Sequence, residues 1–163
     1  MPTIDEIQRP IAAELKAFEP HFREAMRSRA ALLDRIMHYI VKRKGKQMRP
    51  MFTLLSARLF GPVNESAFTA ASLIELLHTA TLVHDDVMDE ARIRRGRPTL
   101  AARWGSEISV LLGDCLFAHA LKLAAGFPTT EICRAVAAAT NTVCSGEILQ
   151  TQRRKNFELS RAD

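Results

Sequence analysis

The chain has 163 residues, and its 23 Lys and Arg against 18 Asp and Glu give a formal net charge of +5. Hydrophobic residues make up 47% and charged residues 25%, a composition that excludes a disordered or low-complexity protein. Its three cysteines form no CxxC pair, which argues against a disulfide scaffold or a thiolate zinc site. No basic and apolar leader opens the chain, and charges interrupt the long apolar stretches. We therefore expect no transmembrane segment and a cytoplasmic location.

Apolar positions recur at intervals of three and four along most of the chain, whereas the alternation typical of strands is nearly absent. In chain order, helices are expected over residues 4–18, 22–41, 50–60, 66–89, 106–125 and 130–154. Pro20 is expected to close the first helix, and Gly61 and Gly126 to stop the third and fifth. Two basic loops, KRKGKQMRP and ARIRRGRPT, precede the third helix and follow the fourth. The pattern predicts an all-α antiparallel helical bundle.

The helix expected over residues 66–89 is apolar on most faces, which predicts a central position. Glu75, His78, Asp85 and Asp89 share one face, and Asp86 lies beside it. Because the helix dipole is already negative at this end, crowded carboxylates there favour a compensating cation. Carboxylate oxygens suit Mg²⁺, which often bridges them to substrate phosphates. The segment HDDVMDEA is thus a candidate magnesium site, with a solvated helix end as the alternative.

Basic residues lie in both loops. Arg94 and Arg95 closely follow the aspartates, and arginines bind phosphate oxygens bidentately. Lys46 and Arg49 lie where a helix is expected to begin, and the free backbone amides there favour an anion. His78 can donate to a phosphate oxygen. Solubilising charge is the alternative for each loop, and a hydrogen-bonded core histidine for His78. Two basic loops beside one acidic cluster nevertheless indicate two anion sites separated by a metal.

Four motifs, in this order, resemble the trans-isoprenyl diphosphate synthases, also called polyprenyl synthetases. They are GKQMRP, ELLHTATLVHDDVMDEARIRRGRPT, the LLGD that ends at Asp114 and the GEILQ that ends at Gln150. The resemblance implies the helical fold of the isoprenoid synthases. It also implies a prenyltransferase that condenses isopentenyl diphosphate head-to-tail with an allylic diphosphate, using Mg²⁺, and a homodimer.

The resemblance also implies roles for individual residues. Metal binding on the allylic diphosphate falls to Asp85, Asp86 and Asp89, and Arg94 clamps the same diphosphate. These four residues form the expected catalytic set. Isopentenyl diphosphate is expected to bind to the remaining group, which comprises Lys46, Arg49, His78 and Arg95.

Two small residues imply a long product. Thr81 and Ala80 lie four and five residues before Asp85, where short-chain members of the family tend to carry aromatic side chains. The resemblance therefore implies a medium or long polyprenyl diphosphate, such as an octaprenyl diphosphate. Phe in place of Ala80 is expected to shorten it.

Members of the family are longer and carry a second aspartate-rich motif, which these 163 residues lack. We expect residues 1–163 to form the N-terminal part of one domain, with negligible activity alone. A non-catalytic or complementing subunit of a heteromeric synthase is the alternative. A class I terpene cyclase shares the aspartate motif but needs no second diphosphate grip. One Trp, one Tyr and no basic helical stripe disfavour nucleic-acid binding.

Overall fold

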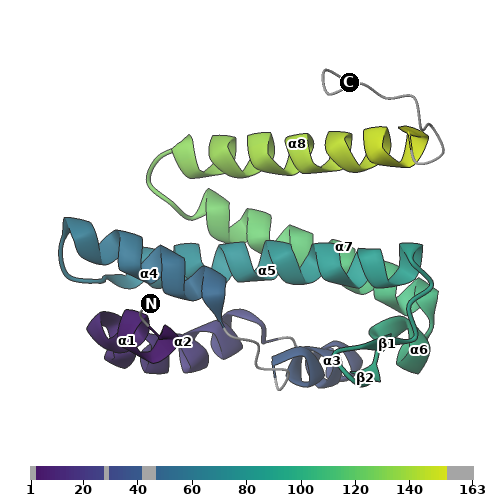
Figure 1. Ribbon diagram of the computed structural model, residues 1–163, viewed down its shortest axis with the longest axis horizontal. Helices are drawn as coiled ribbons and strands as arrows, with labels where there is room; N and C mark the ends of the chain where they lie inside the picture. The colour runs from purple at the N-terminus through teal and green to yellow at the C-terminus, as the bar shows by residue number, and fades with distance from the viewer. Residues whose placement is uncertain (1–2, 28–29, 42–46, 154–163) are drawn as a thin grey trace. The chain divides into compact units, whose positions relative to one another are not determined.

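The computed structural model describes residues 3–27, 30–41 and 47–153. The chain divides into two compact units, Met1–Gly126 and Phe127–Asp163. The elements of the first unit are α1 (Ile4–Gln8), η1 (Arg9–Ile11), α2 (Ala12–Ala25), α3 (Ala31–Val41), α4 (Met48–Phe60), α5 (Glu65–Met88), β1 (Ile93–Arg94), β2 (Arg97–Pro98), α6 (Leu100–Trp104) and α7 (Ser106–Ala125) (Figure 1). The predicted all-α class is confirmed.

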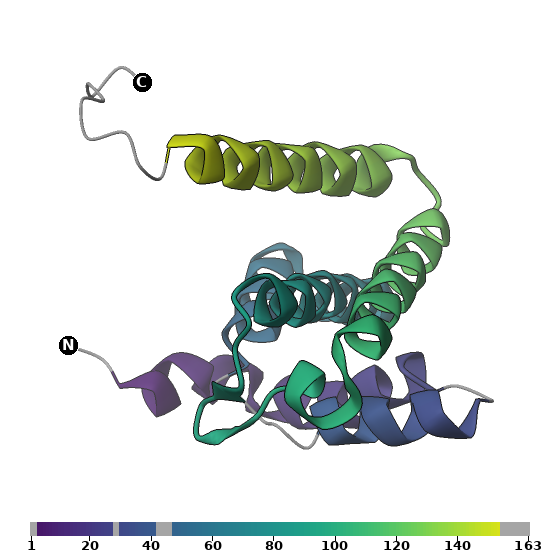
Figure 2. The same cartoon turned by 90° about the vertical axis from the view of Figure 1, so that its right-hand side faces the viewer.

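The helix α5 is the centre of the first unit, as the sequence predicts. Helices α2, α4, α6 and α7 all pack against it, and α7, which runs at an angle beside α5 in Figure 2, makes the most extensive contact. The side chain of Asn64 caps α5 by accepting a hydrogen bond from the backbone N–H of Ala67 at 3.0 Å. The buried apolar side chains of α5 include Leu73, Leu76 and Val83, and the burial of each stabilises the fold by about 1.5–3 kcal/mol. The aspartates at its tip thus extend from a firmly packed helix.

The helices α5 and α7 are each long and apolar enough, by length and composition alone, to cross a membrane. Charged residues nevertheless interrupt both helices, as expected from the sequence: Glu75 in α5, and Asp114 and Lys122 in α7. Core helices of soluble proteins meet the same criterion. Leu76 and Ala80 of α5, and Leu116 and Ala120 of α7, have no exposed surface. Packing inside the first unit thus buries part of these two helices, 39% of the apolar window of α5 and 33% of that of α7.

The N-terminal helices differ from the prediction. Pro20 lies inside α2 and does not end it. Because Pro20 is exposed, the carbonyl of Lys16, which loses its intrahelical donor, can face water. Phe18 and Phe22 are buried on either side of it, with ring centroids 5.4 Å apart, so the packed face continues past the proline. The single helix expected over 22–41 is instead divided between α2 and α3.

The second basic loop contains a hairpin that the sequence analysis missed. Strands β1 and β2 are antiparallel, and Arg94 pairs with Arg97. Arg95 and Gly96 form the two-residue turn between them, with φ of 52° and 74°. Positive φ at both positions is typical of type I′ hairpin turns. Thr99 then caps the short helix α6, accepting a hydrogen bond from the backbone of Ala102 at 3.1 Å.

The second unit contains α8 (Glu131–Arg153). The GEILQ motif lies within this helix. No described residue of α8 is buried, and Val143, Ile148 and Leu149 leave large apolar side chains exposed.

Candidate functional site

Asp85 and Asp89 lie one turn apart at the C-terminal tip of α5. The backbone N–H of Asp89 donates to the carbonyl of Asp85 at 2.8 Å, and Asp89 is the C-cap of the helix. Asp85 is half-buried and Asp89 is exposed. Residues four apart on a helix share a face, so both carboxylates belong to one side of the tip.

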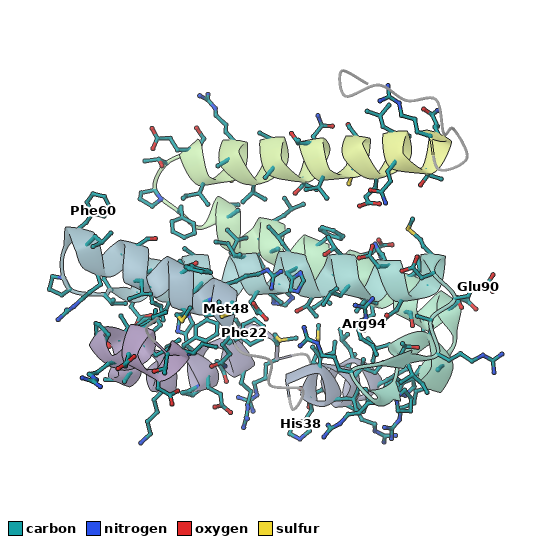
Figure 3. The ribbon with its side chains drawn as sticks, viewed as in Figure 1. Phe22, His38, Met48, Phe60, Glu90 and Arg94 are labelled. Atoms are coloured by element: carbon teal, nitrogen blue, oxygen red, sulfur yellow. The ribbon has the colours of Figure 1, made fainter. Side chains whose placement is uncertain are left out.

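Asp86 faces the hairpin. The Nε of Arg94 donates to its Oδ1 at 2.6 Å, and Figure 3 shows Arg94 between the hairpin and α5. Only 4% of Asp86 is exposed, whereas 34% of the Arg94 side chain is. A short charge-assisted hydrogen bond of this kind is about twice as strong as a neutral one. The charge of Asp86 is therefore balanced by the protein itself, whereas Asp85 and Asp89 form no ion pair with another described residue.

The donor set at the tip suits a metal shared with a ligand. Within residues 3–27, 30–41 and 47–153, no three Asp, Glu, His or Cys side chains come close enough to hold a metal ion together. Asp85 and Asp89 nevertheless provide hard oxygen ligands on one face. Mg²⁺ is commonly held by one or two carboxylates together with substrate phosphates and water. The two aspartates fit that arrangement, and the predicted third ligand, Asp86, is engaged with Arg94.

Arginines from both basic segments act on the same face of α5. Arg49, in the first turn of α4, and Arg95, in the hairpin turn, both shift the pKa values of His78 and Glu75. Arg94 also acts on His78. Such electrostatic effects fall off within about 10 Å, so these groups are near one another. Segments well separated in the sequence thus act electrostatically on one face of α5.

His78 is a neutral imidazole at pH 7. Burial, together with the charges of Arg49, Arg95 and Arg94, lowers its pKa from 6.5 to about 4. The neutral ring has one N–H to donate. An anion bound among the arginines would offset their charge and favour the protonated ring. Hydrogen bonding to a phosphate oxygen, the role expected from the sequence, is therefore chemically available to His78.

Glu75 belongs to the same cluster, although the sequence analysis gave it no role. Burial raises its pKa, and the nearby Arg49 and Arg95 oppose that shift. Its Oε2 is buried and has no hydrogen-bond partner among the described residues. The signal for its membership was its spacing of three residues from His78, which places both on one helix face. Glu75 is therefore coupled electrostatically to both basic segments, through Arg49 and Arg95.

The backbone of Arg95 is strained. Its φ of 52° lies in the left-handed region, which costs a residue with a Cβ about 1–2 kcal/mol. The neighbouring Gly96, at 74°, has no such cost. Non-glycine residues in this region concentrate at functional sites. The strain is consistent with the predicted role of Arg95 in binding a diphosphate.

The two positions expected to set product length, Ala80 and Thr81, differ in burial. Ala80 has no exposed surface. Thr81 is half-buried, and its hydroxyl donates to the carbonyl of His78 at 2.9 Å. Lys46, expected to bind isopentenyl diphosphate, lies outside the described residues.

Known proteins match this chain over most of its length. The sequence model of the family described as polyprenyl synthetase matches residues 30–163. An all-trans-nonaprenyl-diphosphate synthase (geranyl-diphosphate specific) from Rhodobacter capsulatus is 39% identical over 90% of this chain and 46% of its own length. Component 2 of heptaprenyl diphosphate synthase from Geobacillus stearothermophilus is 36% identical over 91% and 46%. The chain spans about half the length of these curated relatives.

Solved structures show the same fold. A polyprenyl synthase from Caulobacter crescentus, complexed with calcium and isoprenyl diphosphate, superimposes with a TM-score of 0.89 at 33% identity, over 98% of this chain and 49% of that one. The predicted isoprenoid synthase fold is confirmed. With its ordered motifs and the family match over residues 30–163, the chain belongs to the polyprenyl synthetase family.

Proposed function

We propose that this chain provides a diphosphate-binding part of a prenyltransferase that condenses isopentenyl diphosphate head-to-tail with an allylic diphosphate. The observation that carries the proposal is the convergence of Arg49 and Arg95 on the His78 face of α5, whose tip bears Asp85 and Asp89. Arg49 and Arg95 act on His78 of α5, and the tip of the same helix bears two carboxylates. Such a set of groups suits two diphosphates better than one.

At the acidic tip, Asp85 and Asp89 would hold Mg²⁺, which when bound supplies positive charge to a departing diphosphate. Arg94 uses its Nε to bind Asp86, so its terminal nitrogens can donate to the same diphosphate. These hydrogen bonds stabilise the negative charge that develops as the allylic carbon–oxygen bond breaks. Asp86 contributes by holding Arg94 in place.

The second diphosphate belongs to isopentenyl diphosphate. Its diphosphate group binds to Arg49, Arg95, His78 and Lys46. The double bond of isopentenyl diphosphate attacks the allylic carbon. The apolar helices exclude water that would quench the allylic cation. The departing diphosphate is a candidate for the base that removes the final proton.

The product is a medium- or long-chain polyprenyl diphosphate. Support comes from Ala80 and Thr81, neither of which places an aromatic ring near Asp85. The similar proteins named above are a nonaprenyl-diphosphate synthase and component 2 of a heptaprenyl diphosphate synthase. A homodimer in the cytoplasm is part of the same proposal.

A second candidate is a complementing subunit of a heteromeric prenyl synthase. One observation favours it: the chain is similar to component 2 of a heptaprenyl diphosphate synthase. In this case, activity would require a partner chain.

Calorimetric titration of the chain with isopentenyl diphosphate, and separately with geranyl diphosphate and Mg²⁺, tests the proposal. Arg49→Gln is expected to weaken isopentenyl diphosphate binding about tenfold or more, because each charge-assisted hydrogen bond contributes roughly 1.5–3 kcal/mol. Asp85→Asn should remove the Mg²⁺ dependence of geranyl diphosphate binding. Arg58→Gln, which removes an equal charge from the other end of α4, is the control. No diphosphate binding by the unaltered chain would refute the proposal.

Turnover separates the two candidates. Residues 1–163 are incubated with labelled isopentenyl diphosphate, an allylic diphosphate and Mg²⁺, alone and with a candidate partner chain. We expect negligible product from the chain alone. Product that forms only on mixing supports the heteromeric candidate, whereas rapid turnover by residues 1–163 alone contradicts the expected inactivity.

A further inference from the structure

Tyr39, near the C-terminal end of α3, reaches the hairpin that carries Arg94 and Arg95. Its hydroxyl donates to the carbonyl of Pro98 at 3.1 Å. Pro98 pairs with Ile93 across the hairpin, directly beside the Arg94 pair. A hairpin with strands of two residues is marginal alone, so contacts from outside determine where it lies.

The ring of Tyr39 is held by α6. Trp104 meets it edge-on, with ring centroids 5.1 Å apart and an interplanar angle of 77°. The Arg103 guanidinium carbon lies 4.8 Å from the centroid of Tyr39 and 4.9 Å from that of Trp104. Aromatic edge contacts and cation–π contacts each contribute about 0.5–1.5 kcal/mol. Figures 1 and 2 show α3 next to α6, in agreement with these contacts.

Thr99 ties the same end of the hairpin to the two residues that precede β1. It is fully buried, and its hydroxyl donates to the carbonyl of Ala91 at 2.6 Å. Its backbone N–H donates to the carbonyl of Arg92 at 3.0 Å. Thr99 therefore closes the hairpin on itself, and Tyr39, bound to the preceding residue, ties it to α3. The helix α3 is also the element that precedes Arg49 in the chain.

We propose that Tyr39 is a positioning residue of the diphosphate site. Its bond to Pro98 and its stack against Arg103 and Trp104 hold the β1–β2 hairpin, and with it Arg95, in place over α5. The inference rests on the proposed function, because Arg95 matters only where a diphosphate binds. In a loosened hairpin, Arg95 samples more positions. Losing that conformational freedom on binding lowers the affinity for a diphosphate.

Tyr39→Phe tests the inference, since it keeps the ring and its stack but removes the hydroxyl. The probe is inorganic pyrophosphate without metal, which leaves the aspartates out of the measurement. We expect Kd to rise about three- to tenfold, the effect of one lost hydrogen bond. In the ligand-free chain, backbone amides of Gly96 and Thr99 should exchange hydrogen faster, while Tm stays nearly unchanged. Thr69→Val removes a comparable hydroxyl bond to the carbonyl of Glu65 and should change neither Kd nor the exchange of these amides.

A double-mutant cycle separates positioning from general destabilisation. In an Arg95→Gln background, Tyr39→Phe should no longer change Kd, because Tyr39 acts through Arg95. A persisting effect there, or equal Kd values for Tyr39→Phe and the unaltered chain, overturns the inference and leaves the proposed function standing. Absence of pyrophosphate binding by the unaltered chain overturns both.

Discussion

The imidazole of His84 on α5 occupies the space that a side chain at Gly113 of α7 would need. A Cβ built on Gly113 would overlap the ring. The His84 Nε2 donates to the carbonyl of Val110 at 3.1 Å, and the ring also contacts Phe117, with centroids 5.7 Å apart. Because His84 directly precedes Asp85, this close approach of α7 fixes the rotation of the acidic tip. The His84 ring therefore explains on steric grounds why the LLGD motif has glycine at position 113.

Gly113→Ala should destabilise the first unit. The added methyl must displace the His84 ring, and overpacking of this kind costs about 1–3 kcal/mol. Urea unfolding followed by circular dichroism measures the loss, which should shrink in a His84→Ala background. Gly146→Ala in α8 is the control: beyond its chain neighbours and the nearby backbone of its own helix, a Cβ there meets no described atom within 4 Å, so the change should stabilise the helix by up to about 1 kcal/mol. Equal effects at both glycines would contradict the steric argument.

Replacing Arg94 and replacing Asp86, the two members of the buried ion pair, should lower the free energy of unfolding by different amounts. Arg94→Gln leaves the Asp86 carboxylate, 4% exposed, without its counter-charge and should cost about 3 kcal/mol. Asp86→Asn leaves Arg94, whose side chain is 34% exposed, able to reach water, and should cost about 1 kcal/mol. Both values come from urea unfolding at pH 7. A larger loss for Asp86→Asn would reverse the assignment of the buried partner.

Arg95→Asn should stabilise the hairpin and impair binding at once. Asn tolerates the left-handed backbone better than Arg, which relieves about 0.5–1 kcal/mol. The same change removes a guanidinium from the proposed diphosphate site, so Kd for isopentenyl diphosphate should rise about tenfold or more. Gly96→Ala, at φ 74° with open space around it, should destabilise the hairpin by about 1 kcal/mol. Unchanged affinity in Arg95→Asn would remove Arg95 from the site.

His78 should make the fold acid-sensitive. Its folded pKa is lowered from 6.5 to about 4, so between those pH values the unfolded chain binds a proton that the folded chain does not. The stability that depends on the neutral ring is complete above pH 6.5 and is lost as pH falls towards 4. Urea unfolding across this range should show a shallower decline in His78→Gln than in the unaltered chain. Parallel curves would contradict the burial of His78. The raised pKa of Glu75 acts in the opposite sense and is common to both curves.

A phenylalanine should destabilise the fold more at position 80 than at position 81, the two positions expected to set product length. Ala80 has no exposed surface, so Ala80→Phe must displace packed neighbours and should cost about 1–3 kcal/mol or more. Thr81 is half-buried, and Thr81→Phe should be tolerated better. Thermal unfolding of both variants checks the order. In an active enzyme both changes should shorten the product on chromatography, and Thr81→Phe is the better test because it leaves the packing intact.

The long helices are predictable because their boundary signals agree with their apolar spacing. The sequence places helices at 66–89 and 106–125, and α5 and α7 match within one residue. Pro20 misleads because a proline signal is local, whereas the buried rings of Phe18 and Phe22 keep α2 helical through it. Tertiary packing overrides the local preference there.

The hairpin and the ion pair depend on information that spacing does not contain. Strands of two residues are too short to show alternation, and Gly96 in the turn was the one available signal. Helical periodicity shows that Asp86 lies beside the face of Asp85, but not which segment approaches it. That segment is the hairpin carrying Arg94.

The turn between β1 and β2 contains no spare residue, since Arg95 and Gly96 alone connect the paired Arg94 and Arg97. Inserting or deleting one residue there would slip the register and send the Arg94 side chain to the opposite face, away from Asp86. Attempts to alter diphosphate affinity through this segment should therefore vary residue identity and keep its length constant.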